Sequence, residues 1–374
     1  MDAEPLVPRI LCVPVSGAYG MGEYARSLAI ARAVSARWPD AEIHFALSRG
    51  APYAVDTPYP FTVLPASPTF HTPEVVALIR AFAPTLVLFD NAGRTAQLAA
   101  ARAHGARVVC ISARRRQRRK AFRLSWMRLL DEHWIAYPAL VAGALGWSER
   151  LKLSLCGRPV VRFLDVILPP PDPSAAAAVL TRFGLAAGGF VVVVPGGGTG
   201  HPRALDAAQR FQAAALAVAT AGTPTLFVGP GTSGAGLEPS ALRQCRSLPQ
   251  AELIELMRSS ALVIANGGST LLQAIACGRP TLAIPIADDQ PARIERCVAA
   301  GVCVAAPLDA RAIAARAASL IADAALRAAL GRSAAALGLA DGLEVAVRAI
   351  ARLHDLKGAA DIDRRAVVGV HPDA

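Results

Sequence analysis

Residues 262–301 read LVIANGGSTLLQAIACGRPTLAIPIADDQPARIERCVAAG and contain two short apolar runs, each followed by a turn and a helical pattern. The runs LVIA and TLAIPI predict buried strands, because they are short, apolar and rich in branched side chains. The segments STLLQAIA and PARIERCVAA have apolar residues at helical spacing, and a glycine ends each helical pattern. Strands that alternate with helices in this way predict a parallel sheet covered by helices.

The same alternation runs through the whole chain and restarts once, after a proline-rich stretch at 160–173 that we interpret as an extended linker. The first half has predicted strands at 10–15, 42–48, 61–66, 85–90, 107–112 and 134–138, the last one after a single helix over 119–133. A chain of 374 residues exceeds what one core usually organises. We therefore predict two Rossmann-like, doubly wound α/β domains that face a cleft, with residues 1–165 as the first domain, 166–175 as the linker, 176–357 as the second domain and 358–374 as a flexible tail.

The chain is basic, with 39 Lys and Arg against 28 Asp and Glu and a formal net charge of +11. This charge favours an anionic partner, such as nucleic acid, an anionic membrane surface or a phosphorylated substrate. The seven cysteines occur singly, which favours a reducing compartment. The sequence has no signal-peptide pattern and no apolar run near the roughly 20 residues of a membrane span. We expect a cytoplasmic protein, either soluble or peripheral on the inner face of the cytoplasmic membrane.

Several chemistries find no support in the sequence pattern. Cys, His, Asp and Glu nowhere cluster with metal-ligand spacing, so we expect no bound metal. The glycines of GGGTG at 196–200 do not have the dinucleotide-binding spacing, which argues against a nicotinamide site. We therefore expect no cofactor.

The turn between the strand and the helix of the opening stretch carries Gly267, Gly268, Ser269 and Thr270. Glycines let the backbone approach a ligand closely, and the first N–H groups of a helix suit a phosphate. The alternative is an ordinary corner in which Ser269 caps the helix. Gln273 lies one helical turn further on the same face, where it can reach a ribose.

A second polar group, Asp288, Asp289 and Gln290, follows the next predicted strand. Side chains of this kind hydrogen-bond sugar hydroxyls, although an acid before QPAR also suits a helix cap. The carboxyl ends of parallel strands meet at one edge of a sheet, so we expect this group to lie near the glycine turn.

Residues 252–301 resemble the C-terminal half of GT-B glycosyltransferases, in particular the bacterial N-acetylglucosaminyltransferases that form lipid II and related glycolipid synthases. The resemblance implies that the GGST turn meets the diphosphate of a sugar nucleotide, which we expect to be UDP-linked. It further implies a ribose contact from Gln273, where the family usually has Glu. It implies sugar contacts from Asp289 and Gln290. The glycine loop with Gly197 and Gly198 is implied to contact the donor phosphates.

The N-terminal stretch GAYGMGEYAR, residues 17–26, resembles the first loop of the same superfamily, which reads roughly G-x-G-H-x-x-R before a helix. Gly20, Gly22 and Arg26 match this pattern, and Glu23 stands at the position of the histidine. A carboxylate can serve as the base that an inverting transfer needs. Glu23 can equally be a first-turn acid that complements the helix dipole. Arg26 can pair with Glu23 or meet an acceptor phosphate.

Asp90 ends a predicted strand and is the second candidate for the base, because a carboxylate at the carboxyl end of a strand points toward the expected ligand site. The alternative is a cap or an Asx turn before the next helix.

The most basic segment contains Arg114, Arg115, Arg116, Arg118, Arg119 and Lys120 and precedes an aromatic and aliphatic stretch. Such a segment can bind nucleic acid or anionic lipid, or it can be a solvated loop beside core residues. In the families that the sequence resembles, a basic and apolar patch of the N-terminal domain docks at the inner membrane near lipid-linked acceptors. We favour a membrane surface or an anionic acceptor over nucleic acid, because no nucleic-acid-binding motif accompanies the segment.

The hypothesis from the sequence is a metal-independent, inverting glycosyltransferase that moves a sugar from a nucleotide-diphosphate sugar to a lipid-linked or glycan acceptor. Two alternatives remain open at this point. A sugar-nucleotide hydrolase or epimerase can use the same fold and donor loops. A non-catalytic nucleotide-sugar-binding protein would explain why the histidine is missing.

Overall fold

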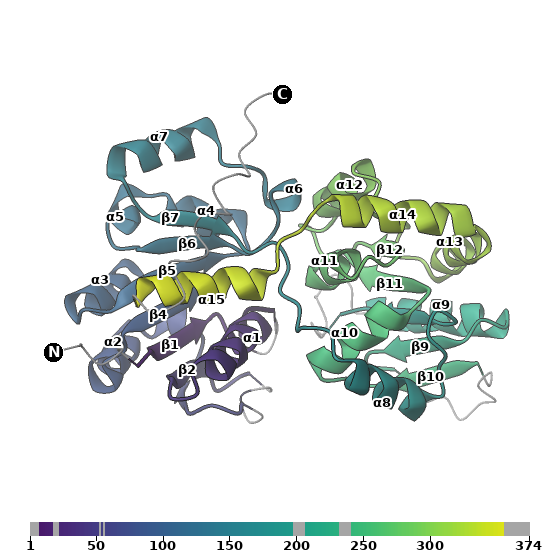
Figure 1. The fold of residues 1–374 in the computed structure, drawn as a ribbon, viewed down its shortest axis with the longest axis horizontal. Coiled ribbons are helices and arrows are strands. Elements are labelled where there is room, and N and C mark those ends of the chain that lie inside the picture. Colours follow the sequence, from purple (N-terminus) through teal and green to yellow (C-terminus); the bar gives the residue numbers. More distant parts are fainter. Residues whose placement is uncertain are drawn as a thin grey trace.

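The computed structural model describes residues 7–17, 22–51, 54, 57–196, 206–231 and 241–354. Within these residues the chain forms two α/β domains, each built on a parallel sheet, of seven strands in the first domain and six in the second. Figure 1 shows the two domains side by side, with the chain passing from one to the other and back. The fold class predicted from the sequence is confirmed.

The first sheet has the strand order β3-β2-β1-β4-β5-β6-β7, and neighbouring strands run parallel throughout the described part of it. The order reverses between β1 and β4, where Pro14 pairs with Asp90 in register. The strands are β1 (Arg9–Pro14), β2 (Glu42–Ser48), β3 (Phe61–Leu64), β4 (Leu86–Asp90), β5 (Arg107–Ser112), β6 (Glu132–Ile135) and β7 (Val160–Phe163).

The second sheet has the order β10-β9-β8-β11-β12-β13 and reverses between β8 and β11. Its strands are also parallel to their neighbours. They are β8 (Val191–Val194), β9 (Thr225–Val228), β10 (Leu242–Cys245), β11 (Leu262–Asn266), β12 (Thr281–Ile284) and β13 (Val304–Ala305).

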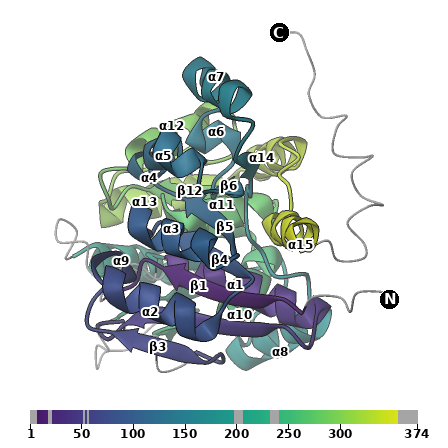
Figure 2. The ribbon, with the colours of Figure 1, turned by 90° about the vertical axis from the view of Figure 1, so that its left-hand side faces the viewer.

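Helices cover both faces of each sheet, because successive strand residues point to opposite faces and both sets are apolar. In the first domain, Ile10 and Cys12 of β1 belong to the core beneath α1 (Gly22–Arg37). Leu11 and Val13 point to the opposite face and belong to the core beneath α2 (Thr72–Phe82) and α3 (Thr95–Ala103). Figure 2 shows α2 and α3 on one side of the sheet and α1 on the other. The remaining helical segments of this domain are η2 (Pro68–Phe70), α4 (Arg115–Ala121), α5 (Leu124–Met127), α6 (Ala139–Ala142) and α7 (Trp147–Cys156).

The second domain follows the same plan. Val191 and Val193 of β8 face α9 and α13, and Val192 and Val194 face α8, α10 and α11. The helices are α8 (Pro173–Phe183), α9 (Ala207–Thr220), α10 (Gln250–Ser259), α11 (Ser269–Ala276), α12 (Pro291–Ala299), α13 (Ala310–Ala322) and α14 (Ala324–Ala336).

The last helix, α15 (Gly342–Leu353), returns to the first domain, whereas the sequence analysis groups all of 176–357 with the second. Ala346, Ala349 and Ile350 belong to the same buried cluster as the first face of β1. Figure 1 shows α15 lying across the first domain. A helix with one apolar stripe can cover either sheet, so its periodicity alone does not identify the domain that it joins.

The two chain crossings lie side by side. Val166 and Asp341 form a parallel bridge, and the N–H of Gly342 donates to the carbonyl oxygen of Val166 at 3.0 Å. A Cβ atom at Gly342 would lie 2.2 Å from the carbonyl oxygen of Leu164, so only glycine fits at this position. Because the outgoing and returning segments are bonded to each other, the domains are joined by a paired connection.

Three local interpretations from the sequence are corrected by the structure. The stretch 160–173 is not linker throughout, because 160–163 forms β7 and pairs with β6. The single helix expected over 119–133 is divided into α4 and α5, and β6 starts at Glu132. Strand β10 was not expected, since its sequence, LRQC, lacks an apolar run.

A separate apolar cluster joins the two domains. It contains Val141 of α6, with Tyr137 and Leu140 packed against it, and it includes Leu271 of α11 and Ile294 of α12. The first domain therefore packs directly on the two helices that follow the strand–turn segments of the opening stretch.

None of the described helices combines the length and the apolar character needed to span a lipid bilayer.

Candidate active site

The first half of the candidate site lies at the point where the strand order of the first sheet reverses, between β1 and β4. Ligands of open parallel sheets bind at such points, beyond the carboxyl ends of the strands. The loop after β1 leads into α1, which carries Glu23 and Arg26 in its first turns, and Asp90 is the last residue of β4. The structure thus brings these three sequence-predicted residues together.

Arg26 and Asp90 form a buried, bidentate ion pair. The guanidinium Nε donates to Oδ2 of Asp90 at 2.8 Å and Nη2 donates to Oδ1 at 2.6 Å. The Asp90 side chain is fully buried and the Arg26 side chain is 8% exposed. Planar guanidinium and carboxylate groups match in this geometry, so the pair fixes α1 on the end of β4.

Burial raises the pKa of Asp90 to about 6, against the opposing effect of the Arg26 guanidinium. For Arg26, burial acts to lower the pKa, and the charge and hydrogen bonds of Asp90 outweigh it and raise the pKa. Asp90 therefore depends on Arg26 to remain charged near neutral pH. The charge of Glu23 also raises the pKa of Arg26.

Glu23 lies beside the ion pair and is almost fully buried. Its Oε1 accepts hydrogen bonds from Nδ2 of Asn91 at 2.8 Å and from Nη2 of Arg114 at 3.3 Å. Asn91 has a positive φ of 50°, a conformation that asparagine tolerates better than most residues, and its Oδ1 accepts from the N–H of Ala113. Asn91 thereby links the ends of β4 and β5 to the carboxylate of Glu23.

The second half of the candidate site lies at the corresponding reversal of the second sheet, between β8 and β11. Asn266, the last residue of β11, donates from Nδ2 to the carbonyl oxygen of Pro195 at 2.6 Å. Its Oδ1 accepts from the N–H of Gly268 at 2.7 Å. A Cβ atom at Gly196 would lie 1.9 Å from Nδ2 of Asn266, so glycine is required there. One side chain therefore fastens the two strand ends at which both glycine loops begin.

The predicted phosphate-binding turn leads directly into α11. Gly268 is the N-cap residue, so no cap side chain occupies the first N–H groups of the helix. Ser269 and Thr270 are half-buried at this helix start, and Gln273 is half-buried one turn later. The N-terminal end of a helix with available N–H groups and hydroxyls favours an anion.

Gly267 and Gln290 have structural contacts in this turn. A Cβ atom at Gly267 would lie 2.7 Å from Cδ1 of Ile294, which shows that glycine lets α12 pack on the turn. The Oε1 atom of buried Gln290 accepts from the N–H of Gly267 at 3.2 Å and from the N–H of Ile286 at 2.8 Å. Gln290 thus ties the ends of β11 and β12 together, while Asp288 and Asp289 are exposed beside it.

Two further residues, Arg293 and Tyr137, lie at the turn and were missed by the sequence analysis. Arg293 of α12 is 9% exposed, donates from Nη1 to the carbonyl oxygen of Gly267 and pairs with Asp289 at 2.8 Å. Its buried Nε has no hydrogen-bond partner within the described part of the chain. Tyr137, which follows β6, lies 3.3 Å from Oγ of Ser269 through its hydroxyl.

Both residues carried a usable signal. Tyr137 lies near the carboxyl end of a predicted strand, 134–138, as Asp90 lies at the end of the predicted strand 85–90. Arg293 lies three residues after Gln290 in the helix that leaves the acidic loop, which puts it on the same helix face. The sequence gives no indication, however, that these two residues meet each other.

The basic segment 114–120 is divided between structural and exposed residues. Arg118 donates to both carboxylate oxygens of Glu149 in α7 and to the carbonyl oxygens of residues 142–144. Lys120 donates to the carbonyl oxygen of Gly93 and lies over the ring of Trp126. Arg115, Arg116 and Arg119 are exposed, and Arg114 is exposed while it contacts Glu23.

Gly22 begins α1 and is exposed, whereas Gly20, Gly197 and Gly198 lie outside the described residues. Among the residues that are described, no group of three or more His, Cys, Asp or Glu side chains is arranged to hold a metal ion.

Comparison with solved structures identifies the architecture as that of GT-B glycosyltransferases. The spinosyn forosaminyltransferase SpnP matches with a TM-score of 0.66 and 14% identity over 93% of this chain and 100% of that one. The structure of LpCGTa in complex with UDP matches with a TM-score of 0.62 and 14% identity, over 93% and 99% of the two chains. A Listeria monocytogenes protein described as a UDP-N-acetylglucosamine 2-epimerase matches with a TM-score of 0.59 and 13% identity, over 92% and 96%.

At these identities the likeness establishes the fold, and it does not single out the enzymes that form lipid II. No protein-family model and no curated protein matches the sequence.

The Arg26–Asp90 pair leads to a prediction about the pH dependence of stability. A carboxyl group whose pKa is raised by folding stabilises the folded state most at pH values below its unfolded pKa, and this contribution is lost as the pH rises through the folded pKa. Arg26→Gln removes the charge that lowers the pKa of Asp90, so that this pKa rises beyond about 6. We expect the variant to lose about 3 kcal/mol of unfolding free energy at pH 8 relative to the wild type, and clearly less at pH 5.

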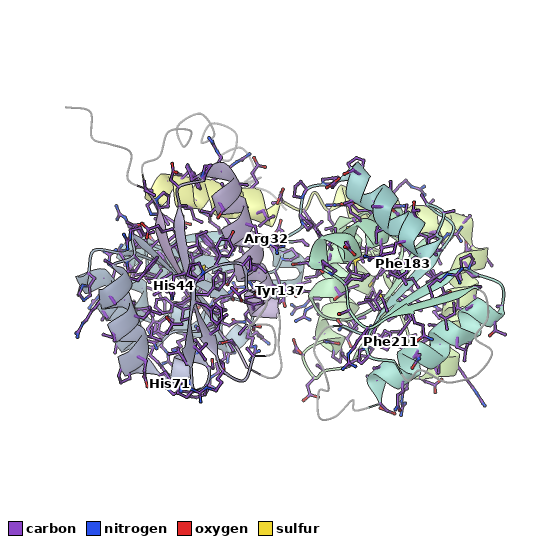
Figure 3. The ribbon with its side chains drawn as sticks, turned by 90° about the horizontal axis from the view of Figure 1, so that it is seen from below. Arg32, His44, His71, Tyr137, Phe183 and Phe211 are labelled. Carbon is purple, nitrogen blue, oxygen red and sulfur yellow. The ribbon has the colours of Figure 1, made fainter. Side chains whose placement is uncertain are left out.

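Urea unfolding at the two pH values measures this difference. Arg32→Gln is the matched control, because Arg32 is an exposed residue of the same helix (Figure 3). Equal losses at pH 5 and pH 8 would show that the charge of Asp90 is not what Arg26 stabilises.

Proposed function

We propose that this protein is a glycosyltransferase that uses a nucleotide-diphosphate sugar. The observation that carries the proposal is that the first domain, through Tyr137, contacts the turn of the second domain that suits a phosphate. The Tyr137 hydroxyl lies 3.3 Å from Oγ of Ser269, and Tyr137 packs on the apolar cluster that joins the domains. A donor bound at the start of α11 would therefore lie at the boundary with the domain that carries Glu23 and Asp90.

The donor half suits a diphosphate. The first turn of α11 offers N–H groups with no cap side chain, and the hydroxyls of Ser269 and Thr270 stand beside them. The guanidinium of Arg293 adds a buried positive charge behind the turn. These groups stabilise the negative charge that develops on a departing nucleoside diphosphate, which is the role that a metal ion has in other transferases. Gln273 is assigned to the ribose, and Asp288 and Asp289 are assigned to the sugar.

In the proposed reaction, an acceptor hydroxyl attacks the anomeric carbon while the bond from that carbon to the diphosphate oxygen breaks. The proton of the hydroxyl goes to the base, and the electron pair of the broken bond leaves with the nucleoside diphosphate. We assign the base to Glu23 and not to Asp90, because both oxygens of Asp90 accept hydrogen bonds from Arg26. Attack from the face opposite the leaving group inverts the anomeric centre.

A uridine nucleotide is the proposed donor carrier. The matching LpCGTa structure is a complex with UDP. The match to a protein described as an epimerase supports a second candidate, a sugar-nucleotide epimerase or hydrolase. Product analysis without an acceptor separates the two functions, because only the second candidate turns over with the donor and water alone.

An anionic membrane surface is the proposed location of a lipid-linked acceptor. Helix α7 presents Trp147, Leu151 and Leu155 at helical spacing, and they are 77%, 50% and 77% exposed. Arg118 joins this helix to α4, which exposes Arg115, Arg116 and Arg119. Exposed tryptophan and leucine beside arginine suit the interface of an anionic bilayer.

The donor proposal predicts binding that depends on Ser269. Calorimetry with UDP-, GDP- and dTDP-sugars should detect binding to the wild type for at least one of them. Ser269→Ala should weaken this binding by about tenfold, because a hydrogen bond to a charged phosphate is lost. Ser319→Ala, at an exposed position of α13, should leave the affinity unchanged. If none of the three sugar nucleotides binds, the donor proposal is wrong.

The assignment of the base predicts a change in turnover without a change in donor binding. Glu23→Gln keeps the shape of the side chain and removes its ability to accept a proton, so kcat should fall by about 10²–10⁴-fold. The dissociation constant of the donor should stay within about twofold. Steady-state kinetics and calorimetry on the same preparation test both statements, and an undiminished kcat would reject Glu23 as the base.

The membrane proposal predicts binding to vesicles that requires anionic lipid. In sedimentation assays the protein should bind vesicles containing phosphatidylserine and should bind pure phosphatidylcholine vesicles at least about tenfold more weakly. Trp147→Ser with Leu155→Ser should abolish the binding, whereas Leu216→Ser, at an exposed position of α9, should not. Equal binding of the double variant and the wild type would exclude α7 from the contact.

A further inference from the structure

Tyr137 belongs to the first domain but reaches the donor turn of the second. It lies between β6 and α6, and its hydroxyl oxygen is 3.3 Å from Oγ of Ser269. Figure 3 shows Tyr137 on the side of the first domain that faces the second. Within the described part of the chain, Tyr137 is the one group that hydrogen-bonds the Ser269 side chain, so Tyr137 orients the serine hydroxyl.

The surroundings hold Tyr137 in this position. Its ring packs with α6 in the apolar cluster that joins the domains, which also contains Leu271 and Ile294. Arg296 of α12 donates to the carbonyl oxygen of Val141 in α6. The apolar packing of the ring and the hydrogen bond that holds α6 on α12 together fix Tyr137 beside the turn.

Arg293 connects the ring of Tyr137 to the backbone of the donor turn. The guanidinium carbon lies 4.9 Å from the ring centroid, within the range of a cation–π contact. The same guanidinium donates to the carbonyl oxygen of Gly267 and to Asp289. The ring, the guanidinium and the turn therefore form one rigid stack, and its phenol end meets Ser269.

The direction of the Tyr137–Ser269 hydrogen bond becomes defined when an anion occupies the turn. A serine hydroxyl has one proton to donate, and phosphate oxygens only accept. A phosphate at the start of α11 therefore takes the proton of Ser269. The Ser269 oxygen is then left to accept from Tyr137, whose hydroxyl supplies the second proton. The result is a chain from phenol to serine to phosphate, in which each hydrogen bond polarises the next.

We propose that Tyr137 is a positioning residue of the donor site, which acts across the domain boundary by orienting the Ser269 hydroxyl toward the donor diphosphate. The inference rests on the proposed function, because it requires a nucleoside diphosphate at the start of α11. It goes beyond that function in assigning part of the donor recognition to the acceptor-binding domain.

A double-mutant cycle tests the inference. The dissociation constants of UDP, GDP and dTDP are measured by calorimetry for the wild type, Tyr137→Phe, Ser269→Ala and the double variant. Phenylalanine keeps the ring beneath Arg293, so the melting temperature should hardly change. Tyr137→Phe should weaken binding of the preferred diphosphate by about fivefold in the wild-type background and should have no effect in the Ser269→Ala background.

Two additional variants complete the cycle. Ser269→Thr retains a hydroxyl, so the effect of Tyr137→Phe should return in that background even if the affinity itself differs. Tyr59→Phe is the matched control, because the Tyr59 hydroxyl also lies beside a serine hydroxyl, that of Ser35, at 3.0 Å within the first domain. Tyr59→Phe should leave all three affinities unchanged.

The outcomes separate this inference from the proposed function. If the wild type binds none of the three diphosphates, the proposed function and the inference both fail. If the wild type binds and Tyr137→Phe binds equally well, only the inference fails. An equal loss in the wild-type and Ser269→Ala backgrounds also overturns it, since Tyr137 would then act without Ser269.

Discussion

The parallel direction of every strand pair described in the two sheets determines where the candidate site lies. Parallel strands send their carboxyl ends to one edge, and the reversal of strand order separates the loops that leave two neighbouring strands. In the first sheet this places Glu23, Arg26 and Asp90 together, and in the second it places Asn266 beside the two glycine loops. The candidate site is thus a consequence of topology before it is a matter of particular side chains.

The buried charges of the two halves are arranged differently. In the first domain, Arg26 donates to both oxygens of Asp90, and Glu23 accepts hydrogen bonds from Asn91 and Arg114. In the second domain, Arg293 shares its charge between a carbonyl oxygen and an exposed carboxylate, and its Nε lacks a partner within the described residues. Each half therefore places a buried arginine beside a carboxylate, Arg26 beside Asp90 in the first domain and Arg293 beside Asp289 in the second.

The sequence was sufficient for the alternation of strands and helices, and with it for the fold class. It was also sufficient to place Asp90 at the end of a strand and Ser269 at the start of a helix, because that inference needs only local periodicity. Contacts between residues distant in the sequence could not be predicted from local periodicity. Arg26 and Asp90 are 64 residues apart, and Tyr137 and Ser269 are 132 apart. The division of the basic segment into structural and exposed arginines also depends on tertiary partners, such as Glu149 for Arg118. The role of Gln290 as a tie between two strand ends was hidden for the same reason.

The return of α15 to the first domain has a consequence for the order in which the chain can be completed. Ile350 and its neighbours fill the core beneath α1, and the paired crossing at Val166 and Asp341 anchors them there. During synthesis, the first domain emerges from the ribosome without α15, which covers part of its core. Helix α15 is made only after the entire second domain. The domain that is made first is therefore finished last, which reverses the usual N-terminal-first order of multidomain chains.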